Sequence, residues 1–256
     1  MCSGHMRKVD TSTGTGGGVA KLLYQYDSYL REFEATVVRV EGNRVFLDQT
    51  AFHPRPAGGL DADTGWLVAG GMRVKVLGAE LAGSDVAHVV EDSTPFSPGL
   101  RVIGAIDWER RYRMMRLHTA SHVLAAVLYS RHGALITGGH ITPEEARDDF
   151  DLRVGDWKLA VLEAMEEANA ILARGLEVRV YWLPREEALK IPGVVKLADR
   201  LPPKEPEIRI VEIPGVDAQA DGGPHVRNTS EVGRIVVKGL ESKGARKKRV
   251  YYTVEP

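Results

Sequence analysis

The 256-residue chain has little of several features that would assign it to a specialised class of proteins. Its single cysteine, Cys2, excludes a disulfide framework and a zinc site built from several thiolates. No apolar run approaches the ~18 residues of a membrane span, and the N-terminus has no apolar core of a secretory signal. Acidic and basic residues nearly balance, with 35 Asp and Glu against 34 Lys and Arg, so nucleic-acid contacts would need local basic patches. We therefore expect a cytoplasmic globular protein.

The first part of the chain predicts a leader followed by a small β-barrel. Residues 1–19 are rich in Gly, Ser and Thr and predict a flexible leader. Residues 20–106 contain short segments in which apolar and polar residues alternate, and Gly-containing turns separate them. The expected strands are 35–40, 44–47, 66–68, 72–77 and 87–90. Short strands at this spacing favour a barrel, with residues 48–65 as a long and therefore functional loop.

The rest of the chain, residues 107–256, predicts an α+β domain. Asp107 is a suitable N-cap for a helix that runs to His132 and ends at Gly133, and Asp156 caps a second helix over residues 157–174. The other expected elements are a hairpin over 134–152, a helical turn over 185–190, and strands over 176–182, 208–213, 234–240 and 249–254. The fold class is therefore α+β: a small barrel, then a domain in which a long helix packs on an antiparallel sheet.

Residues 117–122 read LHTASH and contain the most specific local signal in the chain. His118 and His122 are four residues apart, so a helix projects both imidazoles from one face at a separation that suits one Zn²⁺. No Glu follows the first His, which excludes the HExxH pattern of metalloproteases. The spacing alone leaves open a pair of half-buried histidines beside an apolar stripe.

A second cluster lies about 100 residues later, where residues 216–226 read VDAQADGGPHV. Asp221 and His225 are four apart on a Gly-rich turn, and together with the helix pair they supply four groups for a metal site. The same composition also suits an ordinary surface turn.

Taken together, these motifs resemble the editing domain of alanyl-tRNA synthetase and its free-standing relatives, the AlaX proteins. The resemblance extends to residues 47–59, LDQTAFHPRPAGG, followed by DTG at 63–65, which are similar to that family's LDxTxFYPxxGGQxxDxG segment. It covers about residues 24–256 and matches the medium form of AlaX, with its barrel and editing domain.

The resemblance implies a trans-editing hydrolase that deacylates mischarged Ser-tRNA(Ala), and Gly-tRNA(Ala) as a second candidate substrate. In the family, two His from the helix and a Cys and a His from the later turn hold zinc. The corresponding positions here are His118, His122, Asp221 and His225. One Zn²⁺ per chain is the implied cofactor, and mischarged tRNA is the implied partner.

The chain departs from the family pattern at three positions. Asp221 stands where the family has Cys, and a carboxylate is a harder ligand that favours a weaker site or another divalent metal. Leu60 replaces the Gln after the two barrel-loop glycines, and Gly138 stands where synthetase editing domains often have Gln.

The resemblance also indicates which residues build the substrate pocket. We expect Ser121 and Thr50 to act on the substrate, and Gly58 and Gly59 to bind it. Ser121 is equally compatible with a small residue on the core-facing stripe of the helix. Gly58 and Gly59 are compatible with a tight turn that needs positive φ.

Two basic clusters are candidates for contact with RNA phosphates. Arg110, Arg111, Arg113 and Arg116 lie just before His118, and we expect them to bind RNA. A second cluster precedes two tyrosines near the C-terminus, and it fits either RNA contact or protection of a strand edge. It consists of Lys243, Arg246, Lys247, Lys248 and Arg249.

Two rival functions remain at this point. The departures at residues 60, 138 and 221 favour a tRNA-binding module with a degenerate metal site and weak catalysis. A metallohydrolase for another small ester is the second rival.

Overall fold

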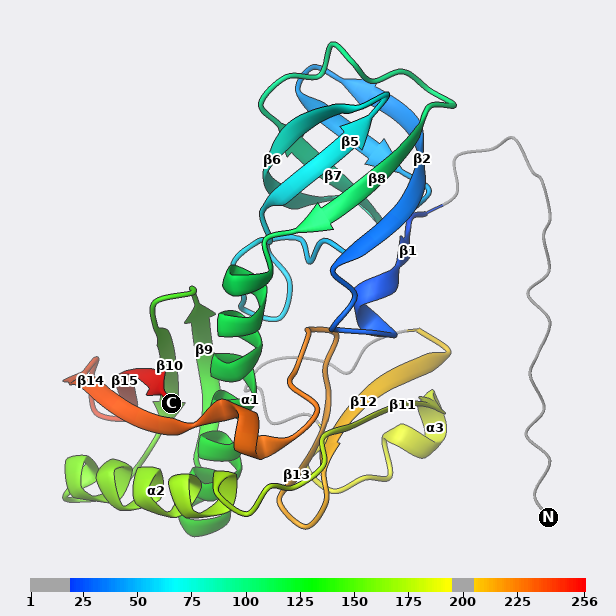
Figure 1. The fold of residues 1–256 in the computed structure, drawn as a ribbon. Helices are drawn as coiled ribbons and strands as arrows, with labels where there is room; N and C mark the ends of the chain where they lie inside the picture. Colours follow the sequence, from blue (N-terminus) through cyan, green and yellow to red (C-terminus); the bar gives the residue numbers. More distant parts are fainter. Residues whose placement is uncertain (1–18, 195–204) are drawn as a thin grey trace.

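The computed structural model describes residues 19–194 and 205–256, so nearly all of the expected leader lies outside the described residues. Its first large unit is a closed antiparallel barrel in the strand order β2-β3-β7-β6-β5-β8 (Figure 1). The barrel strands are β2 Glu32–Glu41, β3 Arg44–Leu47, β5 Gly65–Ala69, β6 Met72–Ala82, β7 Asp85–Val90 and β8 Arg101–Ile106. Their alternating pattern places mostly Val, Ala, Leu and Phe side chains inside, which form one apolar core.

Small elements connect the barrel to the rest of the molecule. Strand β1 (Lys21–Leu22) pairs in parallel with β4 (Gln49–Thr50), and the 3₁₀ helix η1 (Leu23–Gln25) follows β1. The loop between β4 and β5 leaves the barrel and reaches the second unit. There Ile141 N donates to Gly59 O at 2.9 Å, and Asp61 N donates to Ile141 O at 2.8 Å.

The second unit is organised around α1 (Trp108–His132), which enters it directly below the barrel (Figure 1). The Asp107 carboxylate accepts the Arg110 N–H, and Gly133 ends the helix in the left-handed conformation at φ 64°. Residues 117–128 are all buried. A helix that is covered on every side is a rigid support, because its side chains have no room to change rotamer.

Two antiparallel sheets and two further α-helices complete this unit. One sheet has the order β14-β15-β10-β9, and the other has the order β11-β12-β13. Helix α2 (Trp157–Leu172) packs on α1 and β14. The other elements are β9 Leu135–Ile141, β10 Ala146–Asp151, β11 Arg179–Pro184, α3 Arg185–Ala188, β12 Glu207–Ile213, β13 Asp217–Ala220, η2 Thr229–Val232, β14 Arg234–Ser242 and β15 Lys247–Glu255.

The structure confirms the predicted fold class, a small barrel followed by an α+β arrangement with a long helix on an antiparallel sheet. Four strands were not predicted: the short β1 and β4, β8 in the barrel, and β13 beside the predicted metal ligands. Helix α2 ends two residues earlier than expected, at Leu172, and β11 begins three residues later than expected, at Arg179. The proposed division into domains at residues 20–106 and 107–256 stays a prediction. No helix within residues 19–194 and 205–256 is long and apolar enough to span a membrane.

Candidate metal centre

The structure brings the four predicted ligands together. His118 and His122 project from one face of α1, and Asp221 and His225 come from the segment that follows β13. One ligand atom from each residue lies within 4.8 Å of the other three. His225 Nε2 lies 3.1 Å from Asp221 Oδ1, and His118 Nε2 lies 3.7 Å from Asp221 Oδ2. A cluster of this composition and size can hold a divalent metal ion.

The other ring nitrogen of each histidine has its own protein partner. His118 Nδ1 lies 3.3 Å from Pro224 O, and His225 Nδ1 lies 3.0 Å from Thr119 Oγ1. His122 Nδ1 lies 3.1 Å from Asp217 Oδ2, and this carboxylate also accepts the Gln219 amide at 2.8 Å.

These contacts orient all three rings with Nε2 toward the common centre. A ring hydrogen bond of this kind fixes the tautomer and raises the basicity of a metal-binding imidazole. The donor set therefore fits a metal ion.

The protonation states of the ligands also suit a metal. Burial and the nearby His225 hold the pKa of His118 well below its usual range, and burial lowers the pKa of His225 to about 4. Burial acts to raise the pKa of Asp221, but the imidazoles, His118 first, outweigh it and hold that pKa well below its usual range. Neutral imidazoles and an ionised carboxylate are the forms that bind metal.

A close-packed turn holds Asp221 and His225 in place. The Arg209 Nη1 donates to Asp221 O at 2.7 Å and to Gly223 O at 3.0 Å, while Gly223 N donates to Asp221 Oδ1 at 2.8 Å. A Cβ at Gly223 would lie 2.7 Å from His118 Cε1, closer than any real contact. Glycine is therefore required here for space beside the His118 ring.

The cluster opens on a cavity of about 270 Å³. The barrel loop supplies Gly58 and Gly59 to its wall, α1 supplies Ser121, and β9 supplies Gly138. Gly58, Gly59 and Ser121 are among the positions that the sequence predicts for the pocket, and Gly138 is one of the three departures from the family pattern. Ser121 donates a hydrogen bond of 2.7 Å to Asp148, a lining residue that sequence reasoning missed.

Thr50, which the sequence predicts for this pocket, does not line the cavity. Thr50 is fully buried on the barrel side, where its Oγ1 lies 2.7 Å from His88 Nε2 and accepts the Phe52 N–H at 3.0 Å. Leu60, one of the departures from the family pattern, is also buried and belongs to the apolar core around α1.

The structure places the four arginines at the start of α1 in different surroundings, and their role in RNA binding stays a prediction. Arg111 is fully buried and forms an ion pair with Asp63, so its guanidinium cannot reach RNA. Arg110 is bound to Asp61 and Ala62 O. The remaining two arginines donate mainly to backbone carbonyls: Arg113 to Pro143 and Val254, and Arg116 to Val232 and Glu255.

The C-terminal basic cluster has a mixed arrangement. Lys247 and Arg249 form ion pairs with Asp149, and Lys243 forms one with Glu241. A shallow hollow of about 360 Å³ is lined by Lys243, Arg246 and Lys247 and shares Thr137 with the metal-site cavity.

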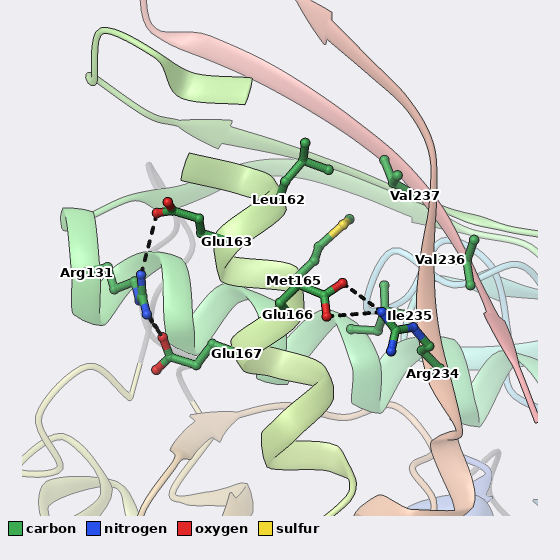
Figure 2. A pocket seen from close by; sticks show the side chains of 10 residues that line it. All are labelled: Arg131, Leu162, Glu163, Met165, Glu166, Glu167, Arg234, Ile235, Val236 and Val237. Carbon is green, nitrogen blue, oxygen red and sulfur yellow. Dashed lines mark hydrogen bonds and ion pairs between the residues drawn. The ribbon is translucent and has the colours of Figure 1, made fainter. Parts of the chain in front are cut away.

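A larger hollow of about 920 Å³ lies away from the metal cluster, between α2 and β14 (Figure 2). Its floor is apolar, with Leu162 and Met165, and ion pairs at its rim join Arg131 to Glu167 and Arg234 to Glu166 (Figure 2). None of the predicted site residues lines it, although the structure describes all of them.

Comparisons with known proteins agree with this geometry. The chain is 55% identical over 236 residues to the alanyl-tRNA editing protein AlaX-M of Saccharolobus solfataricus, covering 91% of this chain and 98% of that protein. It is 39% identical over 244 residues to AlaX-M of Methanosarcina barkeri, covering 92% of this chain and 99% of the relative. The alanine–tRNA ligase of Pyrococcus abyssi is 38% identical over 225 residues, which are 86% of this chain and 24% of the ligase.

Residues 208–251 match the second additional domain of threonyl- and alanyl-tRNA synthetases. This segment contains two of the four clustered groups, Asp221 and His225. With two AlaX-M relatives matched over nearly their whole length, the chain belongs to the AlaX-M family of alanyl-tRNA editing proteins.

Proposed function

We propose that this protein is a trans-editing hydrolase that removes serine, and as a second substrate glycine, from mischarged tRNA(Ala). The observation that carries the proposal is the cluster of three buried histidines and one half-buried aspartate, three of whose members line a cavity. The names of the AlaX-M relatives support an editing function for the family.

His118, His122, Asp221 and His225 would hold the metal, for which we propose Zn²⁺. When bound, such an ion supplies a Lewis acid for the ester carbonyl and lowers the pKa of a bound water. The carboxylate of Asp217 and the Thr119 hydroxyl keep two of the imidazoles oriented, so the ligand atoms need little reorganisation.

Ser121, which lines the cavity, is our candidate for contact with the aminoacyl group. Its hydroxyl donates to Asp148, which leaves its oxygen lone pairs available to accept a hydrogen bond from the substrate. A buried polar group that pairs with the seryl hydroxyl would be left unpaired by alanine, and a site of this kind discriminates by ~10⁴-fold or more. The glycines of the barrel loop and β9 have no side chains, so this wall of the cavity leaves room for the substrate.

The tRNA partner requires cations near the cavity. The hollow lined by Lys243, Arg246 and Lys247 shares Thr137 with the cavity, so a phosphate there would lie close to an ester bound in the site. We propose this hollow, in place of the arginines of α1, as a contact for the acceptor end.

Deacylation of Ser-tRNA(Ala) and zinc content, measured together, test the proposal. We expect about one Zn²⁺ per wild-type chain, and loss of both zinc and activity in His118→Ala and His225→Ala. His88→Gln, at a buried histidine on the barrel side, is the matched control and should keep both. Full activity in His118→Ala would contradict the assignment of the site.

Asp221→Cys refines the same experiment. If wild type binds tRNA without deacylating it, with or without added Zn²⁺, and Asp221→Cys restores zinc, the chain is a tRNA-binding module with a degenerate site. Hydrolysis of simple esters that does not depend on RNA would instead indicate a general esterase.

A further inference from the structure

Two neighbouring aspartates of β10 have opposite surroundings. Asp149 faces the outside of the sheet and has two cationic partners, Arg249 at 2.7 Å and Lys247 at 3.0 Å. Asp148 faces α1 and the metal-site cavity, and it is as deeply buried as Asp149. Among the described residues, no lysine or arginine forms an ion pair with Asp148, although a buried carboxylate normally requires such compensation.

One oxygen of Asp148 is fixed by the protein. Oδ2 accepts the Tyr252 hydroxyl at 2.6 Å and the Ser121 hydroxyl at 2.7 Å. Burial, and then the charge of Asp148, raise the pKa of Tyr252 well above its usual value, so this phenol keeps its proton and remains a donor. The two hydroxyls therefore orient the carboxylate and also act against the rise in the pKa of Asp148 that burial causes.

The other oxygen, Oδ1, belongs to a carboxylate that lines the metal-site cavity. No described residue donates a hydrogen bond to it. The cross-strand neighbour of Asp148 is Gly139, where an added Cβ would lie 2.8 Å from Asp148 Oδ1. The φ angle of Gly139 is not positive, so glycine serves here to leave space beside the carboxylate and not to permit a turn.

We propose that Asp148 is a specificity residue whose Oδ1 accepts a hydrogen bond from the α-ammonium group of the aminoacyl ester. This inference rests on the proposed function, because only an aminoacyl substrate brings an ammonium group to this cavity. The ligand then supplies the positive charge that the protein does not, and esters without an amino group are selected against. Charged hydrogen bonds of this kind change affinity by about 10- to 100-fold.

Binding of two non-hydrolysable adenosine conjugates tests the inference by calorimetry. One is 3′-deoxy-3′-(L-serylamino)adenosine. The other is the analogue without the α-amino group, in which 3-hydroxypropanoyl replaces seryl. We expect wild type to bind the seryl conjugate about 10- to 100-fold more tightly, and Asp148→Asn to reduce that preference below about threefold. Asp149→Asn is the matched control and should keep the preference.

Several results would overturn the inference. Equal binding of the two conjugates by wild type would do so whether or not the variant folds, and so would an unchanged preference in Asp148→Asn. The alanyl conjugate adds a further arm, because it has the ammonium group but no hydroxyl. If Asp148→Asn loses only the distinction between seryl and alanyl, Asp148 recognises the hydroxyl and the inference is wrong.

The same wild-type protein, assayed for deacylation of Ser-tRNA(Ala), separates this inference from the proposed function. If the protein deacylates Ser-tRNA(Ala) but binds both conjugates equally, only the inference about Asp148 is wrong. If it prefers the seryl conjugate but does not deacylate Ser-tRNA(Ala), the proposed hydrolase function is wrong and the ammonium site is retained.

Discussion

His88 in the barrel and the three histidines of the metal cluster are all buried, but their ring nitrogens have different partners. His88 Nδ1 donates to Val45 O at 2.9 Å, and His88 Nε2 accepts the Thr50 hydroxyl at 2.7 Å. Each cluster histidine instead has a partner for Nδ1 outside the cluster and turns Nε2 toward the other ligands. His88 thus pairs its two ring nitrogens with a backbone carbonyl and a hydroxyl, whereas each cluster histidine directs one nitrogen at the other potential metal ligands.

The buried charged groups of the barrel side and of the cavity side also differ in whether their partners lie within the protein. Arg111 and Asp63 pair with each other where the barrel loop meets α1, and Asp63 also accepts the His53 N–H at 2.6 Å. Asp148, on the cavity side, is held by neutral hydroxyls and keeps one oxygen for a ligand. The Arg111–Asp63 pair is therefore satisfied within the protein, and we expect Asp148 to serve binding.

Arg111→Met tests this comparison with the largest expected effect. It leaves Asp63 buried without its counter-ion, which costs about 3–5 kcal/mol of unfolding free energy. The double variant Arg111→Met/Asp63→Asn should recover much of that loss, because it removes the uncompensated charge. Urea unfolding of the three proteins measures both effects, and a loss below about 1 kcal/mol in the single variant would show that the pair is not structural.

The pH dependence of stability tests the structural role of His88. Burial lowers the pKa of His88 to about 4, against 6.5 in the unfolded chain. Between these values the unfolded chain binds a proton that the native protein does not, so stability falls as the pH falls from 6.5 to 4. The difference in unfolding free energy is at most about 3.4 kcal/mol.

His88→Gln removes this titration and should flatten the slope of unfolding free energy against pH in that window. The other buried histidines contribute equally to both proteins, so the comparison isolates His88. An identical slope in the two proteins would contradict a neutral, fully paired imidazole.

Asp217→Asn extends the comparison to the partners of the metal ligands. Losing the charge beside His122 Nδ1 should weaken metal affinity about 10- to 100-fold while the fold is kept. Competition with a chelator measures the affinity, with Asp149→Asn as a control at another buried carboxylate. Unchanged affinity would mean that the contact only packs the ring.

The smallest effect is expected at an exposed ion pair of the barrel. The Arg101 side chain is 81% exposed and lies 2.9 Å from Glu34. Solvent screens such a pair, so Arg101→Ala should change the unfolding free energy by less than about 1 kcal/mol. A loss of unfolding free energy as large as that in Arg111→Met would contradict the proposed difference between buried and exposed arginines.

The sequence predicted the elements whose local signals are strong and missed those formed by tertiary contacts. Helix α1 was predicted from its caps, and the four ligands from their spacing and the family motifs. Strand β13 was missed because its residues, DAQA, include no β-branched or aromatic side chain, and pairing with β12 is what extends it. Strand β8 was missed because Gly104 interrupts it, and that glycine makes room for the Phe33 ring.

The arginines of α1 show a different limit. A run of arginines in the sequence shows where positive charge is concentrated but not which way each side chain points. Four arginines within seven residues therefore predicted an RNA-binding surface. One periodic signal was present: Arg111, Met115, His118 and His122 follow helical spacing and share the buried face. The partner of Arg111, Asp63, lies in the barrel loop, and no local pattern places that loop against the helix.

The contact between the barrel loop and β9 has a consequence beyond the shape of the cavity. Strand β9 is an edge of its sheet, and exposed strand edges invite pairing with other chains. The hydrogen bonds that join Gly59 and Asp61 to Ile141 occupy the end of that edge. The opposite edge, β14, has a bulge between Val237 and Gly239 that disturbs regular pairing. We therefore expect substitutions in the barrel loop to affect aggregation as well as the proposed substrate binding, and a loop redesigned for a new substrate must still cover β9.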